Sequence, residues 1–291
     1  MVKKLSELYS EARRALLPAA LDQNDASLMA RDLVCHITGR SRESLLADGE
    51  FYVSDTQCED MEDAVRRIRA GEPLAYVLGE WDFYGMRLQV DPNVLIPRDD
   101  TCAVTELAIR QALFLEKSPR ILDLCTGSGC IGLAVANHVK DSRVTLADLS
   151  RQALAVAKKN IMQQKLSARV TCVQADALQK PPAFLGKFDM IISNPPYVTE
   201  QEMQELPGSV RDYEPSMALY GGKDGLDFYR SIAENYRNVL KPGGYLCLEF
   251  GMGQGDAVCG LLQEKEFMIL ERVRDYNERE RAVLAQYSGK E

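Results

Sequence analysis

A predicted buried strand running into a glycine-rich loop limits the fold more than any other feature of this sequence. Residues 120–132 read Arg-Ile-Leu-Asp-Leu-Cys-Thr-Gly-Ser-Gly-Cys-Ile-Gly. Gly127, Gly129 and Gly132 fit the pattern G-x-G-x-x-G, in which missing side chains allow a tight turn and let a ligand approach the backbone closely. The segment therefore predicts a strand, a ligand-binding loop and a helix of a nucleotide-binding α/β fold.

Further apolar runs alternate with stretches of helical pattern. The predicted strands cover residues 120–125, 143–148, 170–174, 188–193 and 244–250. Such alternation predicts a doubly wound parallel sheet. Two last runs, residues 267–273 and 281–286, flank a polar turn at 275–278. They predict a terminal hairpin that adds an antiparallel strand to the edge of the sheet.

The N-terminal part has a different pattern. Apolar residues recur at helical spacing within residues 5–16, 26–37 and 61–70, which predicts a small helical bundle. Over residues 76–90 the helical spacing gives way to an alternation of apolar and polar residues at 86–90, which predicts a short hairpin. We expect an N-terminal helical bundle over residues 1–75 that docks the substrate, a hairpin linker over 76–103 and a catalytic domain over 104–291.

Acidic residues follow successive predicted strands, and ligands of open parallel sheets bind at such strand ends. Asp148 lies at the distance expected for a carboxylate that binds ribose hydroxyls, a feature that NAD enzymes and S-adenosylmethionine enzymes share. Asp123 favours S-adenosylmethionine, because a carboxylate there attracts its cationic amino-acid end and repels a pyrophosphate. Asp176 and Ala177 are placed to meet an adenine. Each acid alone is also compatible with a helix N-cap.

Asn194-Pro195-Pro196-Tyr197 follows the predicted strand at 188–193 and indicates chemistry on a planar nitrogen. The Asn194 side chain offers an acceptor and two donors, and the prolines fix the backbone and remove two N–H groups. The Asn194 oxygen and the Pro195 carbonyl are placed to accept the hydrogens of an NH2 group and to direct its lone pair at a methyl donor. Tyr197 provides a face on which a flat group can stack. The alternative is a turn that closes the strand.

These motifs resemble those of the HemK/PrmC-type peptide chain release factor glutamine methyltransferases. The resemblance extends over nearly the whole chain and includes residues 71–79, 83–85, 94–98, 214–215, 218–226 and 240–244. It implies a Rossmann-like class I methyltransferase, with a seven-stranded sheet and helices on both faces. It also implies methyl transfer from S-adenosylmethionine to the glutamine of the Gly-Gly-Gln loop in class 1 release factors, the protein partner in translation termination.

The resemblance and the motifs together define the expected site. We expect cofactor contacts from Asp123, Cys125, Thr126, Gly127, Ser128, Gly129, Asp148, Asp176, Ala177 and Asn194. We expect Asn194, Pro195 and Tyr197 to act in catalysis, and Asn194, Pro195, Pro196, Tyr197 and Arg98 to contact the substrate. Arg98 is alternatively a partner of nearby acids. The segment 221–225 is either a wall of the cleft or a glycine turn that leads into a helix.

The chain departs from the family pattern in two places. Arg98-Asp99-Asp100-Thr101 replaces a more acidic family segment, so the substrate side near residue 100 differs. Cys125 stands where many members have glycine, a replacement that requires a negative φ angle. We expect Cys125 to have no catalytic role, because methyl transfer needs no covalent enzyme intermediate.

Composition restricts the class of function. The net charge of −8 argues against a duplex-binding protein, since neutralising phosphates dominates nucleic-acid affinity. Eight cysteines without a C-x-x-C pair and only two histidines predict neither a metal site nor a disulfide framework. No apolar run is long enough for a membrane span, and reduced thiols fit the cytoplasm. The alternative functions are methylation of a ribosomal-protein glutamine or a nucleic-acid base amine, and a non-catalytic S-adenosylmethionine-binding scaffold.

Overall fold

The described residues form two compact units. The computed structural model describes residues 3–47, 49–115 and 117–289. The smaller unit contains the chain up to Gly79 together with Gly208–Tyr213, and the larger unit contains Glu80–Pro207 and the chain from Glu214 onward. The hairpin that follows Gly79 thus belongs to the larger unit. The outermost residues of the expected domains, 1–2 and 290–291, lie outside the described residues.

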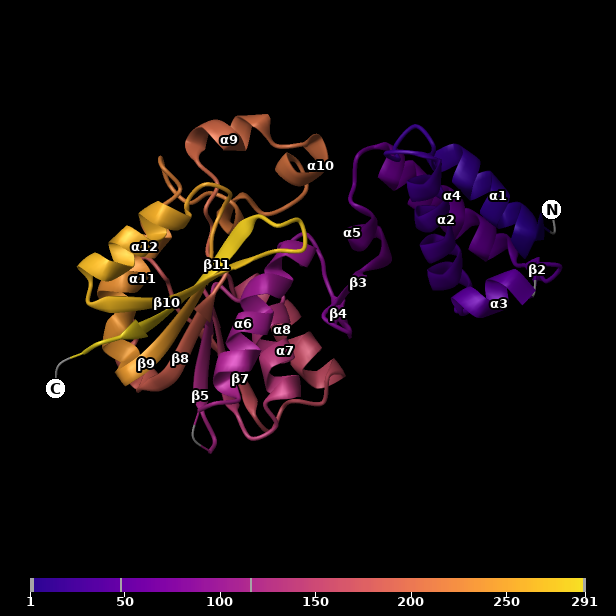
Figure 1. Cartoon of the computed structure of the whole chain (residues 1–291). Coiled ribbons are helices and arrows are strands. Elements are labelled where there is room, and N and C mark those ends of the chain that lie inside the picture. The colour runs from indigo at the N-terminus through magenta and orange to yellow at the C-terminus, as the bar shows by residue number, and fades with distance from the viewer. Residues whose placement is uncertain (1–2, 48, 116, 290–291) are drawn as a thin grey trace. The chain divides into compact units, whose positions relative to one another are not determined.

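The smaller unit is a helical bundle, as the apolar periodicity predicts. Its elements are β1 (Lys3–Lys4), α1 (Leu5–Leu16), α2 (Gln23–Thr38), α3 (Arg42–Ala47), β2 (Tyr52–Val53), α4 (Asp55–Arg69), α5 (Leu74–Leu78) and α10 (Gly208–Arg211) (Figure 1). Leu5, Leu8 and Leu16 of α1 are buried in one core with Leu33 of α2 and Ile68 of α4.

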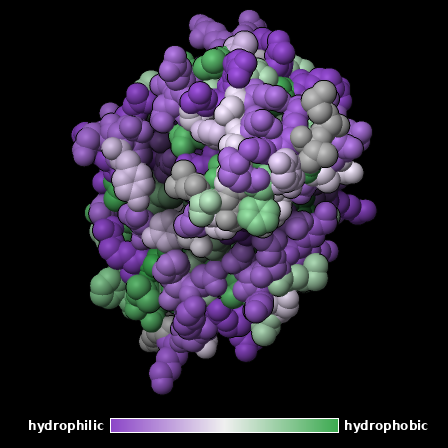
Figure 2. Space-filling model, turned by 90° about the vertical axis from the view of Figure 1, so that its right-hand side faces the viewer, coloured by the Kyte–Doolittle hydropathy of each residue, from purple (hydrophilic) through white to green (hydrophobic). Residues whose placement is uncertain are grey.

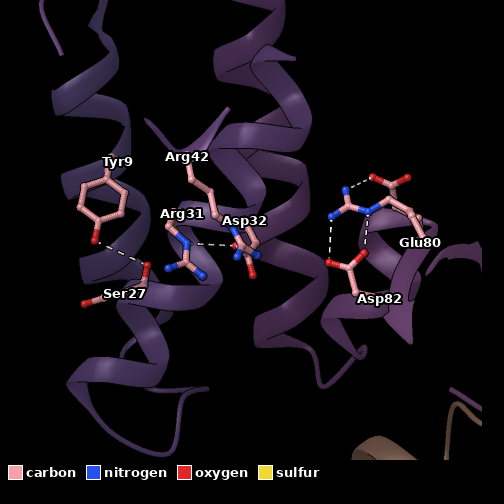
Figure 3. Close-up of polar contacts among 8 residues, drawn as sticks. Tyr9, Ser27, Arg31, Asp32, Arg42, Glu80 and Asp82 are labelled. Atoms are coloured by element: carbon pink, nitrogen blue, oxygen red, sulfur yellow. Dashed lines mark hydrogen bonds and ion pairs between the residues drawn. The ribbon is translucent and has the colours of Figure 1, made fainter. Parts of the chain in front are cut away.

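Polar contacts join the helices of this bundle. The Tyr9 hydroxyl of α1 donates to the Ser27 carbonyl of α2 at 3.5 Å (Figure 3). Arg42 of α3 donates to the Asp32 carboxylate of α2 at 3.3 Å (Figure 3). Helix α4 begins before the predicted apolar stretch because Ser54 opens it with a capping box, in which Ser54 Oγ accepts from the backbone of the third helical residue.

One face of the molecule is largely polar. The face in Figure 2 is mostly hydrophilic, and apolar residues appear on it as small separate groups. Among the helices described, none combines the length and the apolar character that crossing a membrane requires.

A short hairpin opens the larger unit. Its antiparallel strands are β3 (Glu80–Phe83) and β4 (Met86–Gln89). The turn residues Tyr84 and Gly85 have φ angles of 48° and 73°, and this pair of positive angles is typical of the turns that close two-residue hairpins. Arg87 donates to Asp82 at 2.8 Å and to Glu80 at 2.9 Å across the hairpin (Figure 3). The predicted hairpin is confirmed, but its expected first residues form α5.

A sheet forms the centre of the larger unit and has seven strands within the described residues, in the order β10-β11-β9-β8-β5-β6-β7. The strands are β5 (Arg120–Leu124), β6 (Arg143–Asp148), β7 (Val170–Gln174), β8 (Phe188–Ser193), β9 (Leu240–Glu249), β10 (Phe267–Arg274) and β11 (Glu280–Tyr287). Strands β5 to β9 pair in parallel, which confirms the predicted doubly wound sheet.

The terminal hairpin differs from the prediction in one respect. Strand β11 pairs antiparallel with both β9 and β10, so it lies one position inside the edge. Its central residues Ala282 to Ala285 are all buried. A continuous apolar run needs cover on both faces and pairing on both sides, whereas the half-buried β10 tolerates an edge.

Helices cover both faces of the sheet (Figure 1). The elements between the strands are η1 (Asp99–Thr101), α6 (Cys102–Ala112), α7 (Cys130–His138), α8 (Arg151–Gln163), η2 (Ala183–Leu185), α9 (Glu200–Glu205), η3 (Ser216–Ala218), α11 (Asp227–Asn235), η4 (Tyr236–Val239) and α12 (Gly255–Glu264). Helices α6, α7 and α8 share one apolar core with Ile121 of β5. Helices α11 and α12 share a second core with Leu122 and Leu124, so successive β5 side chains face opposite layers.

A buried asparagine joins three parts of the larger unit. Asn160 of α8 has no exposed surface. Its Oδ1 accepts from the Gln89 backbone at 2.7 Å, and its Nδ2 donates to the Gln89 carbonyl at 3.0 Å and to the Ser128 carbonyl at 2.9 Å. The end of β4 and the glycine loop are therefore both fixed to α8.

Replacing this side chain should destabilise the fold. Asn160→Leu removes the side-chain partner of the part-buried Gln89 N–H and carbonyl and of the buried Ser128 carbonyl, so we expect the free energy of unfolding to fall by about 3 kcal/mol. Urea unfolding of the full chain measures the change. The exposed Asn238→Ala is the control and should shift stability by less than about 0.5 kcal/mol. Equal effects of the two substitutions would contradict the role assigned to Asn160.

Candidate active site

The ends of four parallel strands line one cavity of about 400 Å³ in the larger unit. Its floor contains Cys125, Thr126, Gly127 and Ser128 after β5, Asp148, Leu149 and Ser150 after β6, Ala175, Asp176, Ala177 and Leu178 after β7, and Asn194 and Pro196 after β8. Its other walls include Val94, Pro97, Arg98, Thr101, Pro215, Met217, Tyr220, Gly222 and Phe228. The volume lies within the range of pockets that bind small molecules.

The glycine loop is held from beneath by Asp123. This side chain is fully buried, and its Oδ2 accepts from the Thr126 hydroxyl at 2.6 Å and from the Gly132 N–H at 2.9 Å. Burial raises the pKa of Asp123 to about 7. Among the described residues, Asp123 is not part of the cavity lining. The predicted contact of Asp123 with the cofactor stays a prediction, and its observed contacts stabilise the loop.

The two other predicted acids reach the cavity. Asp148 accepts from the backbone N–H groups of Gly127 and Ser150, both at 2.9 Å, and burial raises its pKa. Asp176 Oδ1 accepts from the Leu178 N–H at 2.8 Å, and Ala177 beside it is buried. Each carboxylate keeps acceptor capacity beyond these local bonds.

The polar and apolar side chains along the strand ends fit S-adenosylmethionine. Asp148 and Asp176 are acceptors suited to ribose hydroxyls and to an exocyclic amine. Leu149 and Ala177 supply apolar walls for a flat base. The carboxylates favour a cationic ligand and oppose a pyrophosphate, because like charges repel strongly in a partly buried cavity.

Cys125 corrects one prediction. We expected a negative φ angle at Cys125, and this expectation is wrong. Its φ angle is 59°, which lies in the left-handed region that favours glycine. The sharp turn out of β5 demands this backbone, and the cysteine is strained by about 1 kcal/mol. Burial raises the pKa of its thiol, which keeps it protonated and uncharged.

Asn194 lies at the cavity at the end of β8. Its neighbour Ser193 donates to the Leu124 carbonyl at 2.6 Å, which ties the ends of β8 and β5 together. The Asn194 Nδ2 donates to Thr101 Oγ1 at 3.2 Å. Because the amide nitrogen is engaged there, the carbonyl oxygen is the end of the side chain left for a ligand.

Of the other three residues in the Asn-Pro-Pro-Tyr motif, one belongs to the cavity lining. Pro196 lines the cavity, but within the described residues the lining includes neither Pro195 nor Tyr197. The Tyr197 ring is half-buried against the second apolar core, and burial raises the pKa of its hydroxyl. The Tyr197 carbonyl accepts from Gln254 Nε2 at 3.0 Å. The stacking role of Tyr197 and the substrate contact of Pro195 stay predictions.

Arg98 lines the cavity and forms an ion pair with Glu214. Glu214 is buried and also accepts from the Ile96 N–H at 3.1 Å. The position of Arg98 is therefore compatible both with a substrate contact and with a role as the partner of a nearby acid. Asp100, in the segment that departs from the family pattern, pairs with Arg281 at 3.0 Å.

The glycine segment 221–225 braces the Asn-Pro-Pro-Tyr motif. Gly221 N–H donates to the Val198 carbonyl at 2.9 Å, and Val198 N–H donates to the Leu219 carbonyl at the same distance. A Cβ atom at Gly221 would lie 2.6 Å from the Pro196 carbonyl oxygen and from Tyr197 Cα. Gly222 lines the cavity and has a φ angle of 95°. The segment is thus both a tight turn and a wall.

Several residues around the site were not among its expected members, although Glu214 belongs to a segment that carries the family resemblance. Thr101, Glu214 and Glu249 come from separate segments and are brought to the site by the fold. These three polar side chains are distinguished by being buried, and burial is known only from the three-dimensional structure.

Comparisons with known proteins identify the class and the family. Residues 7–79 match the PrmC N-terminal domain and residues 104–207 match the Methyltransferase small domain. A release factor glutamine methyltransferase of Clostridium acetobutylicum is 36% identical over 257 residues, which cover 88% of this chain and 90% of the relative. One from Escherichia coli is 38% identical over 259 residues, which cover 89% and 91%.

A crystal structure of a methyltransferase from Pyrococcus furiosus has the same fold, with a TM-score of 0.52 and 18% identity over 79% of this chain and 100% of that one. The fold and the site thus define a class I methyltransferase with S-adenosylmethionine as the methyl donor. The chain belongs to the release factor glutamine methyltransferase family.

The strain at Cys125 is testable by substitution. Cys125→Val should lower the free energy of unfolding by about 2 kcal/mol, because a β-branched residue adapts poorly to a positive φ angle. Cys125→Gly should stay within about 1 kcal/mol of the wild type. Urea unfolding measures both. Cys172→Val, in the middle of strand β7, is the matched control and should be tolerated; equal costs at both positions would contradict the strain.

The close packing at Gly221 should matter for activity. Gly221→Ala must move the backbone of Pro196 and Tyr197, and with it Asn194, so we expect the rate of methyl transfer to fall by roughly 100-fold. Calorimetry should still detect S-adenosylmethionine binding. Gly260→Ala is the control, because nothing lies within 4 Å of its added Cβ atom. An unchanged rate in Gly221→Ala would show that this brace is dispensable.

Proposed function

We propose that this protein methylates the side-chain amide nitrogen of the glutamine in the Gly-Gly-Gln motif of class 1 release factors. The names of its relatives support a release factor glutamine as the acceptor. The single observation that carries the chemistry is the position of Asn194 beside the glycine loop, with its amide nitrogen held by Thr101.

Asn194 orients the acceptor in this mechanism. The lone pair of an amide nitrogen is delocalised, so this nitrogen is a poor nucleophile unless its hydrogens are held. Asn194 Oδ1 and the Pro195 carbonyl accept these hydrogens and turn the lone pair toward the methyl donor. Bound S-adenosylmethionine supplies a sulfonium methyl group as the electrophile. Position and electrostatics thus provide the catalysis.

The proton balance needs no strong base in the site. The acceptor nitrogen gains the methyl group as the bond from that group to sulfur breaks and its electron pair stays on sulfur, so the new N-methyl amide carries a positive charge and its N–H is acidic. That proton then passes to water. Neither histidine of the chain belongs to the cavity lining within the described residues, and the mechanism does not require one.

We further propose that the smaller unit docks the release factor and that the enzyme works in the cytoplasm. The smaller unit has a core of its own, which suits an independent recognition surface. All eight cysteines are free, as expected in a reducing compartment. We expect no stable binding of nucleic acid, since the net charge is −8.

Labelled S-adenosylmethionine tests the proposed function. Wild-type protein should transfer label to a purified class 1 release factor and not to a factor with Gln→Ala in its Gly-Gly-Gln motif. Asn194→Ala should lower the rate by roughly 100-fold or more, because the acceptor amide loses its orientation. Calorimetry with the cofactor alone verifies that the variant still binds it.

Label on the Gln→Ala factor would place the modified residue elsewhere. No label on either factor, with cofactor binding intact, would refute the proposed substrate and make ribosomal protein and RNA the next acceptors to test.

A further inference from the structure

A buried carboxylate that is not part of the cavity lining lies on the strand next to Asn194. Glu249 ends β9 and is 1% exposed. The register of β8 and β9 pairs Ser193 with Leu248, so the next residues, Asn194 and Glu249, leave the sheet side by side. Within the described residues, the cavity lining does not include Glu249, so it has no direct access to a ligand.

Glu249, Thr101 and Asn194 form a small cluster of polar side chains. Asn194 Nδ2 donates to Thr101 Oγ1 at 3.2 Å, and Thr101 is itself 2% exposed. Burial raises the pKa of Glu249, whereas the nearby side chains of Thr101 and Asn194 lower it, because they favour the ionised carboxylate. Glu249 Oε2 has no hydrogen-bond partner among the described residues, so it is the acceptor still available to the donors of this cluster.

An ionised carboxylate accepts hydrogen bonds and cannot donate them. Glu249 therefore requires its neighbours to turn their hydrogens toward it, which directs the Asn194 nitrogen inward and the Asn194 oxygen into the cavity. The two ends of an asparagine amide have nearly the same size, so packing alone does not distinguish them. A donor in place of Glu249 would allow the Asn194 amide to turn over.

We propose that Glu249 is a positioning residue that, through Thr101 and Asn194, presents the Asn194 oxygen to the cavity and so makes the site select a glutamine amide over a glutamate carboxylate. The inference rests on the proposed function for the identity of the acceptor. The oxygen matches the hydrogens of an amide and repels a carboxylate, which carries no hydrogen to donate.

The charges around Glu249 determine when it can act. Arg281 attracts the ionised form, and Asp100 opposes it. Asp275 pairs with Arg281 at 3.2 Å. The other titratable groups whose pKa values the charge of Glu249 raises are Tyr197, Tyr229, Cys102 and Cys130, although burial is the larger cause at each. Burial is the largest influence and raises the pKa of Glu249 to about 7. Because the ionised form is the active one, activity should rise as the pH increases through about 7.

The test compares Glu249→Gln with Asp275→Asn. Both remove one buried negative charge near Arg281, but among the described residues Asp275 has no hydrogen bond to Asn194 and so controls for the loss of charge. For Glu249→Gln we expect kcat to fall by roughly 10- to 100-fold, with S-adenosylmethionine binding retained. The rise of activity near pH 7 should disappear in Glu249→Gln and persist in Asp275→Asn.

A release factor with Gln→Glu in its Gly-Gly-Gln motif reports on selectivity. It should inhibit wild-type protein weakly and Glu249→Gln more strongly, because a turned Asn194 donates to the carboxylate. Equal inhibition of both proteins, or equal loss of kcat in Glu249→Gln and Asp275→Asn, would overturn the inference. Should Glu249→Gln fail to fold, Thr101→Val replaces it: it should lower kcat as well, and Thr101→Ser should restore much of the loss.

A measurement without any acceptor separates this inference from the proposed function. The side-chain amide signals of Asn194, assigned by their loss in Asn194→Ala, should shift with pH around 7 in the ¹⁵N spectrum of wild-type protein. They should not shift in Glu249→Gln. Signals insensitive to pH in the wild type would overturn the positioning role. A wild type that shows the shift but leaves the release factor unlabelled would refute only the substrate.

Discussion

The pairing of β5 with β8 is the constraint on which the site depends. Asp123 pairs with Ile192 and Leu124 with Ser193 in parallel, so the glycine loop and Asn194 leave the sheet as neighbours. The Ser193 hydroxyl, which donates to the Leu124 carbonyl at 2.6 Å, secures this junction. Because parallel strands end at one edge, the glycine loop and Asn194, the proposed acceptor-orienting residue, line one cavity although they come from distant segments.

Local patterns predicted the strands, the glycine loop and the helical bundle, because each depends on neighbours in the sequence. Asn194 and Asp148 were predicted correctly to reach the strand ends. Glu249 was missed, since a single polar residue in an apolar run has no local signature. Thr101 was not expected at the site, because its contact with Asn194 joins segments about ninety residues apart. The positive φ angle of Cys125 was also missed, because the turn out of β5 overrides the preference of the side chain.

Two buried carboxyl groups make the site electrostatically costly. Burial raises the pKa values of Asp123 and Glu249 to about 7. Each group binds its proton more tightly in the folded chain than in the unfolded chain, so its contribution to stability declines as the pH rises from the ordinary carboxyl range toward 7. Apolar residues at these positions would avoid the cost of desolvation. Their retention is understandable when the carboxylates orient donors that the site needs.

Asp123 and Glu249 are both buried acceptors that lie next to residues of the cavity lining. Asp123 accepts from the Thr126 hydroxyl and the Gly132 N–H, which holds the glycine loop in its curved form. In its proposed role, Glu249 acts in the same way on the nearby side chains of Thr101 and Asn194, which favour its ionised form. In both places an acceptor-only group behind the strand end determines the direction of nearby donors. If Glu249 positions Asn194 as we propose, selectivity for a neutral amide depends on the charge of a residue that lies outside the cavity lining.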